Sequence, residues 1–189
     1  MFEGIFSWLL PVILVLIIIG LIGYIFLLYN RFMALKNSAQ ATLGQIKVAL
    51  KKRLDMIQEL LGAVKSYAAF ERETFERVTS MRSKVTTAGP GDLTQVENES
   101  RSLMGRLLAV FENYPVLKTS ETVTNLMNSI KGVEDEIARQ RYTYNNIGQE
   151  FNTLCDTIPS NFIARIIKMR KIEYLEFESE ITTPPKIEF

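Results

Sequence analysis

The side chains best able to do chemistry are few in this sequence and widely separated. The chain has 189 residues and no histidine, so it lacks the side chain most used for proton transfer near neutral pH and the commonest protein ligand of zinc. Its single cysteine, Cys155, cannot form an internal disulfide, and the adjacent Asp156 disfavours the reactive thiolate. We interpret Cys155 as a buried, inert thiol.

Acidic side chains also fail to form a recognisable metal or catalytic site. Glu134, Asp135 and Glu136 are consecutive, and consecutive positions on a helix point in different directions, so a hydrated acidic face explains them better than metal binding. We therefore expect no catalytic residue, no metal and no cofactor. The charge is nearly balanced, with 22 Lys and Arg against 21 Asp and Glu, which argues against a nucleic-acid partner.

Two sets of residues are candidates for partner binding. The basic cluster Lys47, Lys51, Lys52 and Arg53 can bind anionic lipid or an acidic partner, or it can be a solvated helix face, which is the interpretation we favour. On an upright helix Lys51 would lie about 30 Å beyond Tyr29, well outside the range of headgroup charge.

The second candidate is the connection around Tyr114 and Pro115, with Lys118 beside it. Proline after a helix ordinarily ends that helix, and an exposed aromatic tip can also be gripped by a partner. A group of aromatic and amide residues further along allows two roles as well: a buried polar contact that fixes helix register, which we favour, or a docking face. That group is Tyr142, Tyr144, Asn145 and Asn146.

A long apolar segment predicts a membrane anchor over residues 1–30. No charged residue occurs from Gly4 to Asn30, and a bilayer core of about 30 Å needs only about 20 helical residues. The segment lacks the basic start and small-residue cleavage pattern of a signal peptide, so we expect it to stay attached. The residues predicted to lie in the membrane or at its surfaces are Trp8, Leu14, Ile18, Tyr24 and Tyr29.

Cations flanking the anchor predict its orientation. Arg31 and Lys36 follow the apolar segment and no Lys or Arg precedes it. Because cytoplasmic flanks carry the excess of positive charge, we expect a single-pass protein of the cell membrane with its N-terminus outside and the rest of the chain in the cytoplasm.

Apolar residues then recur at steps of three and four, the period of amphipathic helices. This pattern predicts an antiparallel up-and-down bundle over residues 31–170, with helices at 31–86, 92–113, 120–158 and 161–168. Asp92 is expected to cap the second helix, with Gln95 as its reciprocal partner. Residues 171–189 are predicted to form an extended acidic tail that either covers the bundle or is captured by another protein. The fold class is therefore all-α.

Several segments resemble the LemA family, and together they cover almost the whole chain. The chain departs from the family pattern at two places. Gln58 stands at a position where the family pattern has proline, and Phe151-Asn152 stands where it has a second Tyr-Asn pair. The segments are Tyr29–Phe32, Gln45–Ile57, Val64–Ala68, Leu107–Lys118, Arg139–Asn145, Phe151-Asn152, Ile158–Asn161 and Pro185–Phe189.

The resemblance implies a short outside N-terminus, one membrane helix and a cytoplasmic helical bundle, with no established reaction. Members of this family are associated with membrane or organelle biogenesis, or lie beside membrane proteases and stress proteins. We therefore expect a non-enzymatic scaffold or adaptor whose partners are the lipid bilayer and a membrane or cytoplasmic protein. The alternative is a membrane-shaping or organelle-biogenesis protein that assembles into homo-oligomers.

Overall fold

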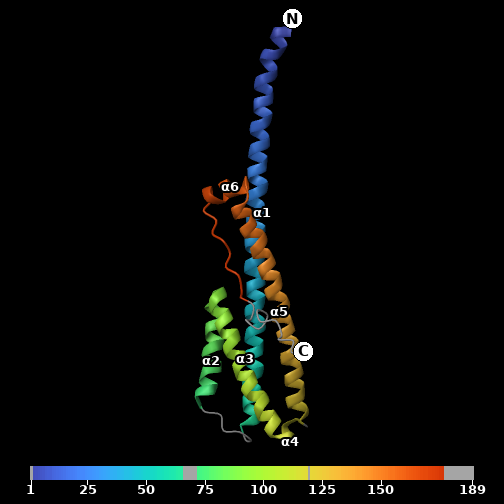
Figure 1. Ribbon diagram of the computed structural model, residues 1–189, viewed down its shortest axis with the longest axis vertical. Helices are drawn as coiled ribbons and strands as arrows, with labels where there is room; N and C mark the ends of the chain where they lie inside the picture. Colours follow the sequence, from blue (N-terminus) through green and yellow to red (C-terminus); the bar gives the residue numbers. More distant parts are fainter. Residues whose placement is uncertain (1, 66–71, 119, 177–189) are drawn as a thin grey trace, which may run out of the picture. The chain divides into compact units, whose positions relative to one another are not determined.

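The computed structural model describes residues 2–65, 72–118 and 120–176, with side chains from Leu9 onward except that of Lys118. Every regular element within these ranges is an α-helix, which confirms the all-α prediction (Figure 1). The helices are α1 (Phe2–Val64), α2 (Arg72–Thr87), α3 (Pro90–Asn113), α4 (Pro115–Lys118), α5 (Glu121–Asp156) and α6 (Ser160–Ile166).

The chain divides into two compact units, and α1 and α5 each contribute to both. Unit 1 comprises residues 1–39 and 147–172, and unit 2 comprises residues 40–146 and 173–189. Each unit has buried apolar side chains of its own, so each is described separately.

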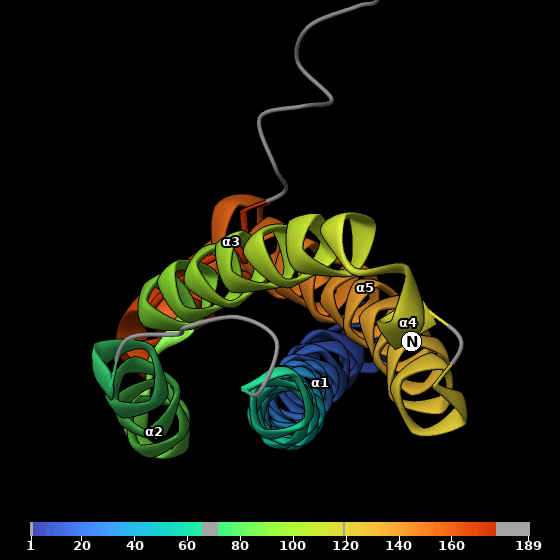
Figure 2. The ribbon, with the colours of Figure 1, turned by 90° about the horizontal axis from the view of Figure 1, so that it is seen from below.

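Unit 2 is an up-and-down helical bundle. In this unit the C-terminal part of α1 is followed by α2, α3 and α5, and successive helices run in opposite directions (Figure 1). Helix α2 lies against α3 in both views (Figure 2). Each helix buries the apolar stripe that its three-four spacing predicted. The core contains, among others, Leu50, Leu54, Ile57, Leu61, Val78, Met81, Val85, Leu93, Val96, Leu107, Ile130, Val133 and Ile137.

The single helix predicted over residues 31–86 is wrong. Helix α1 ends at Val64 and α2 begins at Arg72, and α2 folds back so that Arg82 Nε lies 2.6 Å from Asp55 Oδ1. In one straight helix these two residues would be about 40 Å apart at 1.5 Å per residue. The reversal lets the two stretches of the apolar stripe pack together in one bundle, whereas a rod would leave them apart.

The other predicted helices agree with the structure to within about two residues, apart from the capping of α3. Gly89 occupies the N-cap position, and its N–H donates to Asp92 Oδ2 at 3.3 Å. Asp92 is therefore the third residue of the helix rather than its cap. Its carboxylate is still well placed, because the first turn of a helix favours negative charge.

Unit 1 contains the N-terminal part of α1, the C-terminal end of α5, and α6 with the segment after it. Phe32, Phe151 and Ala164 form its buried cluster. The rings of Phe32 and Phe151 meet edge to face, with centroids 5.5 Å apart, an arrangement that aromatic quadrupoles favour. The partly buried residues around this cluster are Leu35, Leu154, Cys155, Ile167, Met169 and Ile172.

Candidate membrane anchor and interaction surfaces

The N-terminal part of α1 is apolar on all sides and exposed on all sides. Every side chain from Leu9 to Leu27 is exposed, including those of Leu14, Ile18 and Tyr24. A helix at the surface of a water-soluble protein is apolar on one face only. Helix α1 is the one helix in the described part of the chain that is long and apolar enough to cross a membrane.

The protein begins to cover α1 at Leu28 and Phe32, which are buried. Tyr29, between them, stays exposed, and Arg31 forms an ion pair with Glu150 at 2.8 Å. The change from exposed to buried apolar residues therefore coincides with the end of the charge-free segment. The side chain of Trp8, the predicted interfacial aromatic at the opposite end of the segment, lies outside the described residues.

The predicted basic cluster is divided by the structure. Lys51 and Lys52 are exposed, and Lys47 is partly buried, with its ammonium 3.4 Å from the Thr86 carbonyl oxygen. Arg53 is wholly buried, so its prediction as an exposed partner-binding residue is wrong. Arg53 lies between Leu50 and Ile57 at helical spacing, and it therefore falls on the core face although it follows two exposed lysines.

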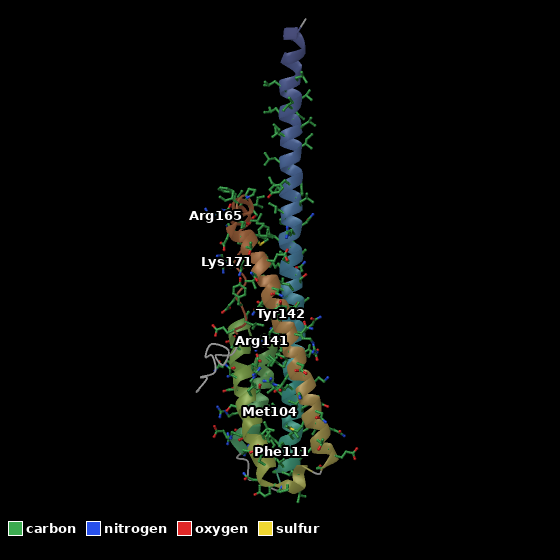
Figure 3. The ribbon with its side chains drawn as sticks, turned by 45° about the vertical axis from the view of Figure 1, so that its right-hand side comes forward. Met104, Phe111, Arg141, Tyr142, Arg165 and Lys171 are labelled. Carbon is green, nitrogen blue, oxygen red and sulfur yellow. The ribbon has the colours of Figure 1, made fainter. Side chains whose placement is uncertain are left out.

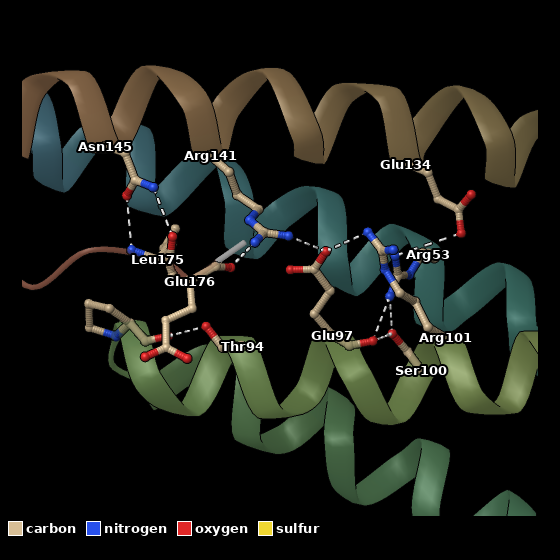
Figure 4. A network of polar contacts seen from close by, with 11 residues as sticks. Arg53, Thr94, Glu97, Ser100, Arg101, Glu134, Arg141, Asn145, Leu175 and Glu176 are labelled. Carbon is tan, nitrogen blue, oxygen red and sulfur yellow. Dashed lines mark hydrogen bonds and ion pairs between the residues drawn. The ribbon is translucent and has the colours of Figure 1, made fainter. Parts of the chain in front are cut away.

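Arg53 anchors a buried polar network between helices of unit 2 (Figure 4). Its guanidinium donates to the Glu97 carbonyl oxygen at 3.1 Å and to the Ser100 hydroxyl, and it lies 3.9 Å from Glu134 Oε1. A buried guanidinium requires such acceptors because an unsatisfied charge in the interior is costly. The network connects α1 to α3 and α5.

The Glu97 carboxylate is the acidic centre of the same network. It accepts from Arg141 Nη1 at 2.7 Å and from Arg101 Nη2 at 3.1 Å. Arg141 also donates to the Glu176 carbonyl oxygen. Because Glu97 and Arg141 are both buried, removing either one would leave an uncompensated charge in the interior. Sequence reasoning did not find this pair, since the two residues are 44 positions apart.

Two asparagines of α5 each hold a residue of the segment after α6 by its main chain. In unit 2, Asn145 donates to the Leu175 carbonyl oxygen at 2.8 Å and accepts from its N–H at 2.9 Å. In unit 1, Asn152 makes the same pair of bonds with Ile172, at 2.9 and 2.8 Å. We name these the asparagine clamps. Over its described part, the C-terminal segment thus lies along the helices, in agreement with the prediction that it covers the bundle. Residues 177–189 lie outside the described chain.

The aromatic residue before each asparagine explains one departure from the family pattern. The Tyr144 hydroxyl donates to the Glu173 carbonyl oxygen at 3.0 Å, and burial, together with the Glu173 carboxylate, raises the pKa of this phenol. Phe151 lacks a hydroxyl and instead packs on Phe32 in the apolar cluster. Tyr144, which is buried, and Asn145, which is partly buried, thus hold the C-terminal segment, whereas Tyr142 is exposed.

The predicted tip is present and is more apolar than expected. Tyr114 ends α3 and Pro115 begins the short helix α4, which was not predicted. Tyr114 and Val116 are exposed, and Leu117 is buried and holds the turn against the bundle. The Lys118 side chain lies outside the described residues.

Cys155 lies partly buried beside the unit 1 cluster. Burial, followed by the charge of Asp156, raises the pKa of its thiol, while Lys171 acts in the opposite direction. Among the described residues no group of three or more potential metal ligands occurs. A cavity of about 220 Å³ near the α2–α3 turn is smaller than most small-molecule sites, which measure about 300–1,000 Å³.

Comparison with known proteins agrees with the resemblance seen in the sequence. The model of the LemA family matches residues 42–189. Magnetosome protein MamQ 2 of Paramagnetospirillum magneticum is 25% identical over 93% of this chain and 74% of its own length. Protein LemA of Metamycoplasma hominis is 29% identical over 84% of this chain and 75% of its own. The match covers the bundle, both clamping asparagines and the tip, and this chain belongs to the LemA family.

Proposed function

We propose that the protein is a single-pass, non-enzymatic membrane scaffold that presents a helical bundle to protein partners at the cytoplasmic face. The observation that carries the proposal is the change of character within α1. Its first part exposes apolar side chains on every face, and its second part buries a single stripe in a bundle. A helix of the first kind suits lipid and one of the second kind suits water.

The proposed orientation rests on cations after the anchor. Arg31 and Lys36 are exposed just beyond the apolar segment, on the side that the positive-inside rule assigns to the cytoplasm. The test uses Cys155→Ser protein carrying one new cysteine, at Phe2 or at the exposed Val48. A membrane-impermeant maleimide should label the first variant in intact cells and the second only after permeabilisation. The reverse pattern would overturn the orientation.

The surface proposed to meet a partner is the α3–α4 tip. Tyr114 and Val116 expose apolar area at a turn whose backbone is fixed by a hydrogen bond from Tyr114 N–H to Val110 O at 3.0 Å. A rigid aromatic on a fixed turn suits binding, because little conformational freedom is lost when a partner docks. The exposed Lys51 and Lys52 are a further candidate surface for acidic groups.

The test of the adaptor role is site-specific photocrosslinking in whole membranes. A photoreactive phenylalanine analogue in place of Tyr114 should give a discrete adduct with another protein. The same analogue in place of Tyr142, an exposed tyrosine on α5, is the matched control and should give none. Equal adducts at both positions, or none at Tyr114, would remove the tip from the proposal.

The alternative function is membrane shaping by self-assembly, and it is favoured by the relatives named as magnetosome proteins. Under this alternative the adduct at Tyr114 would contain two copies of the same chain. Protein solubilised in mild detergent would then sediment as a large, regular assembly, whereas an adaptor should sediment as a monomer or small oligomer.

A further inference from the structure

Helix α6 and the turn before it expose large apolar side chains close together. Ile158, Phe162 and Ile166 are 78%, 58% and 78% exposed. Phe162 and Ile166 are four residues apart on α6, so they share one face of that helix. An exposed apolar face of this kind marks a surface that meets another molecule or a membrane.

The opposite face of α6 is fixed beside the end of the apolar segment of α1. Ala164 is buried in the cluster with Phe32 and Phe151. Phe32 is only five residues beyond Leu27, the last of the exposed apolar residues, which corresponds to about 8 Å of helix. Figure 1 shows α6 beside α1 within this unit. The apolar face of α6 therefore lies level with the point where α1 would leave the bilayer.

The charged residues between Asp156 and Glu173 are all cationic. Residues 157–172 contain Arg165, Lys168, Arg170 and Lys171 and no Asp or Glu. Arg165, labelled in Figure 3, is at the exposed end of α6, while Lys171 is 2.8 Å from Asp156 Oδ2. A short amphipathic segment with apolar side chains and several cations is the composition of an interfacial helix on anionic lipid.

We propose that α6 lies in the interfacial layer of the membrane, as a second lipid contact next to the anchor. Phe162 and Ile166 enter the boundary between headgroups and acyl chains, and Arg165, Lys168 and Arg170 lie near lipid phosphates. This inference rests on the proposed membrane anchor. Lipid is the occupant because the apolar face belongs to the helix that packs at the end of the apolar segment of α1, and because the cations suit anionic headgroups.

The contact has a structural purpose that one helix alone cannot serve. A single membrane helix can rotate about its axis and tilt, because its orientation is set only by neighbours and interfacial anchors. A second contact on one side of α1, attached to it through Phe32 and Ala164, restricts both motions of unit 1. Unit 1 then has a fixed orientation relative to the membrane, with the apolar face of α6 toward the bilayer.

The test measures depth in the membrane with single tryptophans in the full-length protein. The native Trp8 is replaced by Phe, and one tryptophan is placed at Phe162, Ile17 or Tyr142, which are 58%, 56% and 63% exposed. The proteins are reconstituted into vesicles of phosphatidylcholine and phosphatidylglycerol, with or without brominated phosphatidylcholine as quencher. Circular dichroism checks that each variant keeps its helix content.

The inference predicts a blue-shifted emission at position 162 that brominated lipid quenches, strongest for bromine near the headgroup. Position 17 should be quenched most by bromine deep in the acyl chains, and position 142 should not be quenched. Omitting phosphatidylglycerol should reduce quenching at 162 and leave it unchanged at 17.

Each other result overturns a specific statement. Quenching at 17 without quenching at 162 refutes the α6 contact and leaves the anchor intact. A blue shift at 162 without quenching means that protein covers α6, a second copy or a partner, and this also refutes the lipid contact. Equal quenching at 162 and 142 refutes a placement specific to α6. No quenching at 17 refutes the anchor itself, and the inference falls with it.

Discussion

The buried network around Glu97 predicts that removal of its carboxylate and removal of the Arg53 guanidinium lower the stability of the protein by different amounts. Glu97→Leu removes the carboxylate that accepts from Arg141 at 2.7 Å and from Arg101 at 3.1 Å. Arg53→Met removes a wholly buried cation that donates to the Glu97 carbonyl oxygen and the Ser100 hydroxyl and lies 3.9 Å from the half-exposed Glu134 carboxylate. The first change takes the negative charge from a cationic interior, and the second takes away one of its positive charges.

The expected magnitudes follow from what each variant leaves behind. Losing one partner of a buried ion pair costs about 3–5 kcal/mol, and Glu97 and Arg141 are both less than a tenth exposed. After Arg53→Met the Glu97 carbonyl oxygen still accepts from Ser100 Oγ at 2.8 Å, and the Glu97 carboxylate keeps both arginines. Because Arg53→Met leaves no buried charge without a partner, we expect it to cost about 1.5–3 kcal/mol, the range for a lost charged hydrogen bond and less than the cost of Glu97→Leu.

The assay is urea unfolding of the full-length protein in detergent micelles, followed by far-ultraviolet circular dichroism. With a slope of about 2 kcal/mol/M, Glu97→Leu should lower the midpoint by about 2 M and Arg53→Met by about 1 M. The triple variant with Glu97→Leu, Arg53→Met and Arg141→Met should recover most of the loss, because a network replaced whole by apolar groups leaves no buried charge. An Arg53→Met midpoint as low as that of Glu97→Leu would refute this reasoning.

Three further predictions concern the unit 1 cluster, an asparagine clamp and the cysteine. Phe32→Ala should destabilise unit 1 by about 3–5 kcal/mol, measured as faster hydrogen exchange in α6. Asn145→Ala removes two hydrogen bonds and should cost about 1–3 kcal/mol, seen as faster exchange of the Leu175 amide. Cys155 should react slowly with a maleimide at neutral pH, because its raised pKa keeps the thiol protonated. Asp156→Asn should lower this pKa and speed the reaction.

Matched controls separate these effects from general damage. Phe162→Ala changes an exposed phenylalanine and should alter stability in micelles by less than about 0.5 kcal/mol; an effect equal to that of Phe32→Ala would contradict the cluster. Thr143→Ala, an exposed neighbour of Asn145, should leave the Leu175 amide unchanged. If Asp156→Asn slowed alkylation of Cys155, the stated cause of the pKa shift would be wrong.

Helix content was predictable because apolar spacing is a local signal. Val133 and Ile137, or Leu103 and Leu107, fall on one helix face in any arrangement, and they are buried in the structure. The reversal after Val64 was not predictable from that signal. Val78 and Met81 continue the three-four spacing of the preceding helix, so the pattern is the same for one straight helix and for two that fold back.

The candidate site was predictable only where residues act alone. The prediction that Tyr24 and Tyr29 lie at the membrane surface needed no knowledge of distant partners, and the structure shows both side chains exposed. Arg53 was misjudged because its lysine neighbours suggested a basic face, whereas the helical period places it with Leu50 and Ile57. Residues that act through partners far along the chain, such as Glu97 with Arg141, carry no local mark of that pairing.

An amide side chain that meets an N–H and a C=O of the same residue recognises the peptide unit, which all residues except proline share. The asparagine clamps therefore bind the main chain of their segment and not its side chains, and Tyr174, which is exposed, can change without loosening them. Proline at Ile172 or Leu175 is the exception, since it would delete the N–H that the clamp accepts. Amide exchange should then accelerate around the proline and stay slow after Tyr174→Ser. The clamps thus require an N–H at residues 172 and 175, whereas the side chains of Ile172 and Leu175 are held separately by packing.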